Sequence, residues 1–182
     1  MEGEQKGMVI WVTGLSGAGK TMLCNALWGL LKIHKPELVI LDGDAVRAAF
    51  GNDLGYREEN RITQIKRLQG MAKILADQGL IVVVAALYAH PELLAWNREN
   101  LFDYFEVYLE VSLEALRLRD SKGLYAGAAD GEIKNVVGVD IPWHAPIASD
   151  LIINTNHPKR PERLAEQVIA AIPRLRKVTE AA

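Results

Sequence analysis

The chain has 182 residues, a formal net charge of −2 and a hydrophobic fraction of 49%. This length predicts one domain, residues 1–182, and the hydrophobic fraction excludes a disordered or collagen-like chain. The charge balance excludes a general attraction to nucleic acid or to anionic membranes. The single Cys24 cannot form an internal disulfide, no apolar stretch approaches about 18 residues, and residues 1–7 lack a leader pattern, so we expect a cytoplasmic protein.

The apolar pattern predicts the elements in chain order. Continuous apolar runs predict buried strands at residues 8–12, 37–41, 80–87, 105–111 and 150–154. Apolar residues spaced three and four apart predict helices between them, at residues 20–34, 57–78, 91–101, 112–119 and 160–176. Strand followed by helix, repeated along the chain, predicts an α/β fold with a five-stranded parallel sheet and helices on both faces.

Residues 121–146 interrupt this alternation. The segment contains six glycines and prolines, which are Gly123, Gly127, Gly131, Gly138, Pro142 and Pro146, and it also carries charged residues. Long loops inside compact domains are commonly functional lids. We therefore predict a mobile lid over about residues 121–146.

A glycine-rich sequence, GLSGAGKT, follows the first predicted strand at residues 14–21 and opens the next helix. It fits the P-loop pattern G-x-x-x-x-G-K-[ST], in which backbone N–H groups and a helix N-terminus bind nucleotide phosphates. We expect Lys20 to reach the β- and γ-phosphates of ATP and the Thr21 hydroxyl to ligate Mg²⁺. The phosphate-binding backbone is expected from Gly14, Ser16, Gly17, Ala18 and Gly19. A glycine-rich turn without a ligand is the alternative, and the lysine in register argues against it.

The rest of the chain narrows the class of P-loop protein. A GTPase needs an Asn-Lys-x-Asp guanine reader after a late strand, whereas residues 154–157 read NTNH. A mechanical ATPase would need a hydrolytic base beside the P-loop. The small size and the predicted lid instead favour phosphoryl transfer to a small acceptor.

Charged residues lie at the end of the second predicted strand, in LDGDAVR. Asp42 and Asp44 are expected to hold Mg²⁺ waters and to take the acceptor's proton, and Arg47 to bind an acceptor phosphate. An aspartate cap beside a solvated arginine is the alternative. The position of Arg61 is equally compatible with binding the acceptor and with belonging to a solvated basic face of a helix. Arg119 is expected to cover a nucleobase by a cation–π contact.

Several motifs in order, GLSGAGKT, LDGDAVR, LGYREENR, RDSKGLY, GEIKN and GVDIPWHAP, resemble the adenylylsulfate kinase family over about residues 8–154. The resemblance implies ATP-dependent phosphorylation of the 3′-hydroxyl of adenylylsulfate, with Mg²⁺, and we expect a homodimer. It implies that Asp42 and Asp44 lie at the reacting hydroxyl and that Arg47 and Arg61 bind the acceptor. The implied lid includes Lys122, Gly123, Leu124, Tyr125 and residues 132–135, among them Lys134.

The departures from the family cluster on the acceptor side. The serine that some family members phosphorylate is replaced by Tyr88, which excludes a phosphoserine there, and the family's helix asparagine appears as Gln64. The lid phenylalanine, one of two rings that sandwich the acceptor adenine, appears as Val136, while Tyr56 keeps the other ring. Basic lid residues are replaced at positions 126, 127 and 129.

Three functions follow from these residues. The first is the family's own reaction on adenylylsulfate. The second is the same 3′-hydroxyl phosphorylation on another nucleotide such as cytidine diphosphoramidate, which the altered acceptor residues favour. The third is a nucleotide-binding module without catalysis, against which Lys20, Thr21, Asp42 and Asp44 argue.

Overall fold

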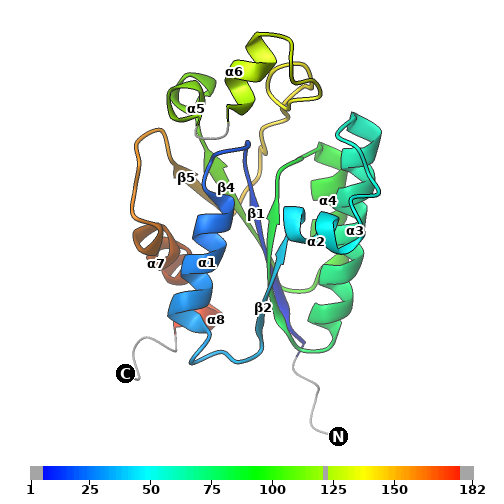
Figure 1. The fold of residues 1–182 in the computed structure, drawn as a ribbon. Coiled ribbons are helices and arrows are strands. Elements are labelled where there is room, and N and C mark those ends of the chain that lie inside the picture. The colour runs from blue at the N-terminus through cyan, green and yellow to red at the C-terminus, as the bar shows by residue number, and fades with distance from the viewer. Residues whose placement is uncertain (1–5, 121–122, 177–182) are drawn as a thin grey trace, which may run out of the picture.

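The computed structural model describes residues 6–120 and 123–176. Its centre is a parallel sheet with the strand order β2-β3-β1-β4-β5 (Figure 1). The strands are β1 Met8–Thr13, β2 Leu38–Asp42, β3 Ile81–Ala86, β4 Tyr104–Glu110 and β5 Leu151–Asn154. Each strand lies on one of the apolar runs of the sequence, and every pairing is parallel, so the prediction of the sheet is confirmed.

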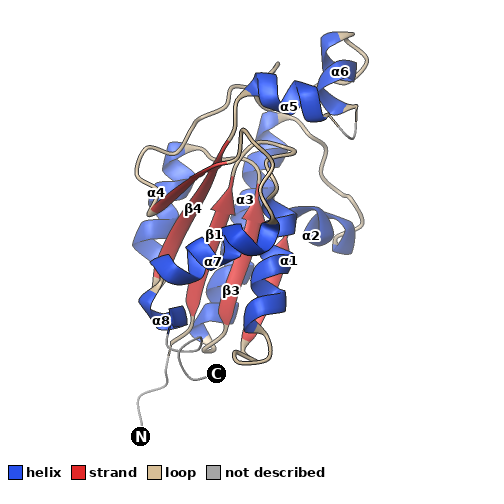
Figure 2. Ribbon diagram, turned by 90° about the vertical axis from the view of Figure 1, so that its left-hand side faces the viewer, coloured by secondary structure: helices blue, strands red, loops and turns tan. Residues whose placement is uncertain are grey.

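Helices cover both faces of this sheet. The helices are α1 Lys20–Leu31, α2 Gly43–Ala49, α3 Glu58–Asp77, α4 Pro91–Asn100, α5 Leu113–Arg119, α6 Leu124–Ala129, α7 Pro161–Ala171 and α8 Pro173–Arg176. α1 and α7 pack together on one face and α3 and α4 on the other, while α5 and α6 lie beyond the carboxyl ends of the strands (Figures 1 and 2).

The central strands form the rigid part of the molecule. All six residues of β1 and all six of β3 are buried, because each strand has neighbours on both sides and helices on both faces. β5 at the edge alternates instead, with Ile153 buried and Ile152 54% exposed. Loops that leave the carboxyl ends of β1, β2 and β3 therefore start from a fixed platform, which is where open α/β sheets bind ligands.

Three helical predictions differ from the structure. α2 was not predicted, and it forms because the Asp42 carboxylate accepts hydrogen bonds from the N–H groups of Asp44 and Ala45 at 2.9 and 3.3 Å. α6 lies inside residues 121–146, for which the sequence predicts a loop without a helix. The predicted helix 160–176 is divided into α7 and α8, because Ile172 precedes Pro173 and takes an extended conformation.

The described part of the predicted lid, residues 123–146, contributes side chains to the hydrophobic core of the domain. Tyr125, Val136, Val137 and Ile141 are buried there. The Asp140 carboxylate accepts hydrogen bonds from the N–H groups of residues 135 and 136 and so closes the turn between them. The mobility of this segment stays a prediction. In the described residues, no helix combines the length and apolarity that crossing a membrane requires.

Candidate nucleotide-binding and phosphotransfer site

The P-loop joins the end of β1 to the first residue of α1. Gly14 has a φ of +152°, and a Cβ atom there would come within 2.7 Å of the Leu109 carbonyl oxygen on β4. Gly19 caps α1 with a φ of +102°, in the left-handed region that side chains disfavour. These two positions explain why the loop needs glycine, and they leave the N-terminus of α1 open to an anion.

Lys20 folds back over the loop that it follows. Its Nζ donates hydrogen bonds to the carbonyl oxygens of Gly14 and Leu15 at 2.8 and 2.9 Å. The ammonium group therefore lies against the loop whose N–H groups are expected to bind phosphate. The sequence pattern predicts that this lysine neutralises phosphate charge, and that role stays a prediction.

Thr21 and Asp42 meet at the mouth of the P-loop. The Thr21 hydroxyl donates to Asp42 Oδ2 at 2.8 Å, and Asp42 Oδ1 caps α2. Two hard oxygen donors in contact suit Mg²⁺, which commonly takes one or two protein oxygens together with substrate phosphates and waters. The described residues contain no cluster of three or more potential metal-ligating side chains, so a site shared with a nucleotide fits this chain better than a complete protein cage.

Asp44 and Arg47 extend from α2 on the acceptor side of this mouth. Asp44 is exposed. Arg47 is only 7% exposed, and its Nη1 donates to the carbonyl oxygens of Leu54 and Gly55 at 2.7 and 3.1 Å. The Arg47 guanidinium lies 4.9 Å from the centre of the Tyr56 ring.

Arg61 approaches the same tyrosine from α3. Its Nε donates to the Tyr56 carbonyl oxygen at 2.9 Å and its Nη2 to the Asn135 carbonyl oxygen at 2.6 Å, while its guanidinium lies 5.7 Å from the Tyr56 ring. Burial and the charge of Arg47 lower the pKa of Arg61. The charge of Arg47 disfavours that of Arg61, so an anion bound beside these two guanidinium groups would be stabilised.

Three of the residues that depart from the family pattern, Gln64, Tyr88 and Val136, lie near this arginine pair and have partners inside the protein. Gln64 donates to the Gly43 carbonyl oxygen at 3.0 Å and accepts from Arg67, so its amide braces α2 against α3. The Tyr88 hydroxyl donates to the Glu58 carboxylate, and burial and that contact raise the pKa of Tyr88. The Val136 side chain is 3% exposed and belongs to the hydrophobic core of the domain.

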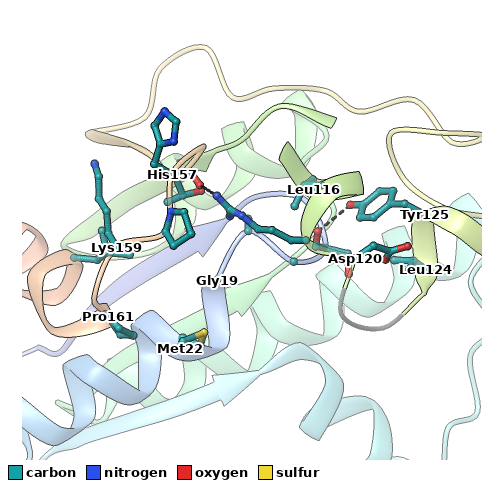
Figure 3. A pocket seen from close by; sticks show the side chains of 16 residues that line it. Gly19, Met22, Leu116, Asp120, Leu124, Tyr125, His157, Lys159 and Pro161 are labelled. Atoms are coloured by element: carbon teal, nitrogen blue, oxygen red, sulfur yellow. Dashed lines mark hydrogen bonds between the residues drawn. The ribbon is translucent and has the colours of Figure 1, made fainter. Parts of the chain in front are cut away.

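A cavity of about 310 Å³ lies on the other side of the P-loop, between residues 16–19 and the loop after β5 (Figure 3). Arg119 lines it, and its guanidinium donates to the Thr155 and Asn156 carbonyl oxygens, at 2.6 Å for Asn156. From α6, the Tyr125 hydroxyl donates to the Ser16 carbonyl oxygen at 2.8 Å. The cavity is the space next to the phosphate site in which a nucleoside would fit.

Some residues that the sequence assigns to the acceptor do not lie beside the Arg47–Arg61 pair. Leu124, expected at the acceptor, lines the cavity beside the P-loop, and Gly123 caps α6 with a φ of +63°. Lys134 is exposed on the lid segment, and Lys122 lies outside the described residues. The sequence did not indicate the cavity-lining residues His157, Pro158, Lys159 and Pro161, because only the sheet topology brings the loop after β5 to the P-loop.

The fold and this site define a P-loop kinase, since a P-loop at the end of β1 and the Thr21–Asp42 pair meet at one edge of a parallel sheet whose two faces are covered by helices. The chain belongs to the adenylylsulfate kinase family, whose model, described as adenylylsulphate kinase, matches residues 6–154. It is therefore an ATP-dependent phosphotransferase.

Relatives with two different named activities are about equally similar to the chain. A cytidine diphosphoramidate kinase of Campylobacter jejuni is 40% identical over 161 residues, which cover 88% of this chain and 94% of the relative. An adenylyl-sulfate kinase of Paraburkholderia xenovorans is 40% identical over 152 residues, or 83% and 85% of the two chains. The solved Mycobacterium tuberculosis APS kinase in complex with AMPPNP and APS has a TM-score of 0.82 and 33% identity, covering 91% and 97%.

Proposed function

We propose that this protein transfers the γ-phosphoryl group of ATP to the ribose 3′-hydroxyl of a nucleotide that carries an activated group on its 5′ side. The observation that carries the proposal is the position of the Thr21–Asp42 pair between the P-loop and the Arg47–Arg61 pair. The P-loop side suits the triphosphate of ATP, and the Arg47–Arg61 side suits a phosphate of the acceptor. Both named activities of the relatives are kinase activities on nucleotides.

The chemistry assigns different work to the two aspartates. Both carboxylate oxygens of Asp42 have hydrogen-bonding partners in Thr21 and α2, which fixes it on the metal side, where Mg²⁺ would neutralise phosphate charge. Asp44 is exposed toward the acceptor side, and we assign it the proton of the 3′-hydroxyl. The 3′-oxygen then bonds to the γ-phosphorus, the bond from that phosphorus to the β,γ-bridging oxygen breaks, and ADP leaves while Lys20 stabilises the developing charge.

For the acceptor we propose a cytidine diphosphate derivative, of the cytidine diphosphoramidate kind, in preference to adenylylsulfate. Stacking a base on an aromatic ring contributes about 1–3 kcal/mol, and Val136 offers no ring opposite Tyr56. A purine base loses more stacking free energy from the replacement of the ring by Val136 than a smaller pyrimidine base does. Tyr88 and Gln64 also change the polar groups at this edge, and a pocket with one polar pattern rejects a ligand with another.

A turnover screen tests both the proposed 3′-kinase reaction and the proposed acceptor. ADP formation is measured with ATP and Mg²⁺ against adenylylsulfate, CDP and cytidine diphosphoramidate, and kcat/KM is compared at the same ATP concentration. A clear preference for adenylylsulfate would overturn the acceptor assignment and leave the kinase reaction in place. Absence of ADP formation with every nucleotide would overturn the 3′-kinase proposal itself.

Two further properties belong to the proposal. We expect a homodimer, and light scattering coupled to size exclusion tests this by the molar mass in solution. We also expect the protein to act in the cytoplasm, where ATP and Mg²⁺ are supplied, and fractionation of cells that express it tests this location.

A further inference from the structure

A tyrosine and a glutamate meet at the acceptor edge of the sheet. Tyr88 follows the end of β3 by two residues and is 2% exposed, and its hydroxyl donates to a carboxylate oxygen of Glu58. Glu58 is the first residue of α3, thirty positions earlier in the chain, and is itself exposed. A buried phenol that donates to an exposed carboxylate fixes that carboxylate in one place while leaving its remaining lone pairs accessible.

This pair adjoins the proposed anion site. Arg61 lies three residues after Glu58 on α3, on the same face of the helix. The charge of Arg61 acts on Tyr88, lowering its pKa against the larger effects of burial and Glu58. The contacts therefore run from the two guanidinium groups to the buried phenol and from the phenol to the exposed carboxylate.

We set the groups of the proposed acceptor along this series of contacts. The reacting 3′-hydroxyl belongs at Asp44 and the 5′ phosphates at Arg47 and Arg61. The group attached beyond those phosphates then lies next to Tyr88 and Glu58. A carboxylate accepts hydrogen bonds only, so it favours a group that carries N–H donors and disfavours one that carries only oxygen acceptors.

We propose that Glu58, positioned by Tyr88, selects the terminal group of the acceptor, favouring a phosphoramidate over a terminal phosphate or sulfate. This assignment rests on the proposed 3′-kinase function. An amidate nitrogen donates to the Glu58 carboxylate, whereas a terminal phosphate oxygen in the same place meets a like charge and has no proton to donate. Glu58 is thus a specificity-determining residue, and Tyr88 is a positioning residue that acts through it.

The test uses two acceptors that differ in one atom group, cytidine diphosphoramidate and CDP. The measured quantity is the ratio of their kcat/KM values in the full-length protein with ATP and Mg²⁺. A hydrogen bond to a charged group contributes enough for roughly a 10–100-fold preference. We expect the wild-type ratio to favour the amidate, and Glu58→Gln to lower the ratio at least about 10-fold, because its amide donates to a phosphate oxygen.

Two further variants separate selection from structure. Glu59→Gln removes the same charge from the neighbouring position of the same helix turn and is expected to leave the ratio unchanged. Tyr88→Phe keeps the buried ring and frees the carboxylate, so it should lower the ratio partly, with an unchanged KM for ATP. Thermal melting curves confirm that each variant is folded.

The outcomes distinguish this inference from the function on which it rests. An equal ratio in wild type, Glu58→Gln and Glu59→Gln, with CDP derivatives still phosphorylated, overturns the role of Glu58 and leaves the kinase assignment intact. Phosphorylation of adenylylsulfate alone overturns the inference together with the acceptor assignment. Phosphorylation of no nucleotide overturns the 3′-kinase function.

Discussion

Replacing Tyr125 with phenylalanine removes one hydroxyl from a side chain that is 4% exposed and keeps the ring that lines the cavity. The variant can no longer form the 2.8 Å hydrogen bond from this hydroxyl to the Ser16 carbonyl oxygen. Such a bond contributes about 0.5–1.5 kcal/mol to the free energy of unfolding. In a domain of this length we therefore expect the Tm to fall by about 1–6 °C.

The same hydrogen bond orients a peptide of the P-loop. A trans peptide is planar, so its C=O and N–H point in opposite directions. Holding the Ser16 carbonyl toward Tyr125 therefore directs the Gly17 N–H away from it, as phosphate binding requires. Without the hydroxyl we expect the KM for ATP to rise about 2–10-fold, with the KM for the acceptor unchanged.

Tyr104→Phe is the matched control for this variant. The Tyr104 hydroxyl donates to Glu106 at 2.7 Å, on a part of β4 remote from the P-loop. Because this hydroxyl also accepts a hydrogen bond from Asn97 at 3.2 Å, the Tyr104→Phe variant should lose at least as much stability, with no change in the KM for ATP. Steady-state kinetics and thermal melting of both variants provide the comparison. If the two variants show the same KM for ATP as wild type, the Tyr125 hydroxyl stabilises the fold without orienting the loop, and the reasoning is refuted.

Three other measurements test the site. Lys20→Ala should remain folded and lose at least about 100-fold in turnover, because Lys20 stabilises charge on the transferred group, and equal rates would contradict this. Hydrogen exchange in residues 123–146 should slow when a non-hydrolysable ATP analogue and an acceptor bind, whereas full protection without ligand would show a rigid scaffold. Burial and Asp120 raise the pKa of Tyr125 to about 12 from 10. Since the folded state favours the protonated phenol, the stability it contributes should be complete below pH 10 and lost as the pH rises through about 12. Chemical unfolding at several alkaline pH values should show a smaller loss in Tyr125→Phe, and an identical loss would exclude this phenol as the cause.

The sheet was predictable because its signals are local and repeated. Each strand of a parallel sheet covered on both faces is a continuous apolar run, and the P-loop has a fixed spacing from the end of β1 to Lys20. The ends of α7 and α8 were less predictable. A proline in an otherwise helical pattern divides it, and the pattern alone does not show that Ile172 adopts the extended conformation.

The remaining parts of the site depend on contacts between distant residues. α2 forms through the cap that Asp42 provides, which the sequence suggested as an alternative to a catalytic role, and the structure shows the cap together with the Thr21 contact. The Tyr88–Glu58 and Tyr125–Ser16 pairs span 30 and 109 positions. The local periodicity of the sequence does not indicate such pairs, because the two residues of each pair come together only when the chain folds.

Asp42 connects two helices to which we assign different substrates. One of its oxygens accepts from Thr21 at the start of α1, and the other holds the first turn of α2, from which Asp44 and Arg47 extend. A nucleotide that changes the position of this carboxylate also turns α2, the short helix that carries the residues we assign to the acceptor. By thermodynamic reciprocity, whatever factor the nucleotide applies to acceptor affinity, the acceptor applies to nucleotide affinity. The dissociation constant of either substrate, titrated with and without the other, reports this coupling directly.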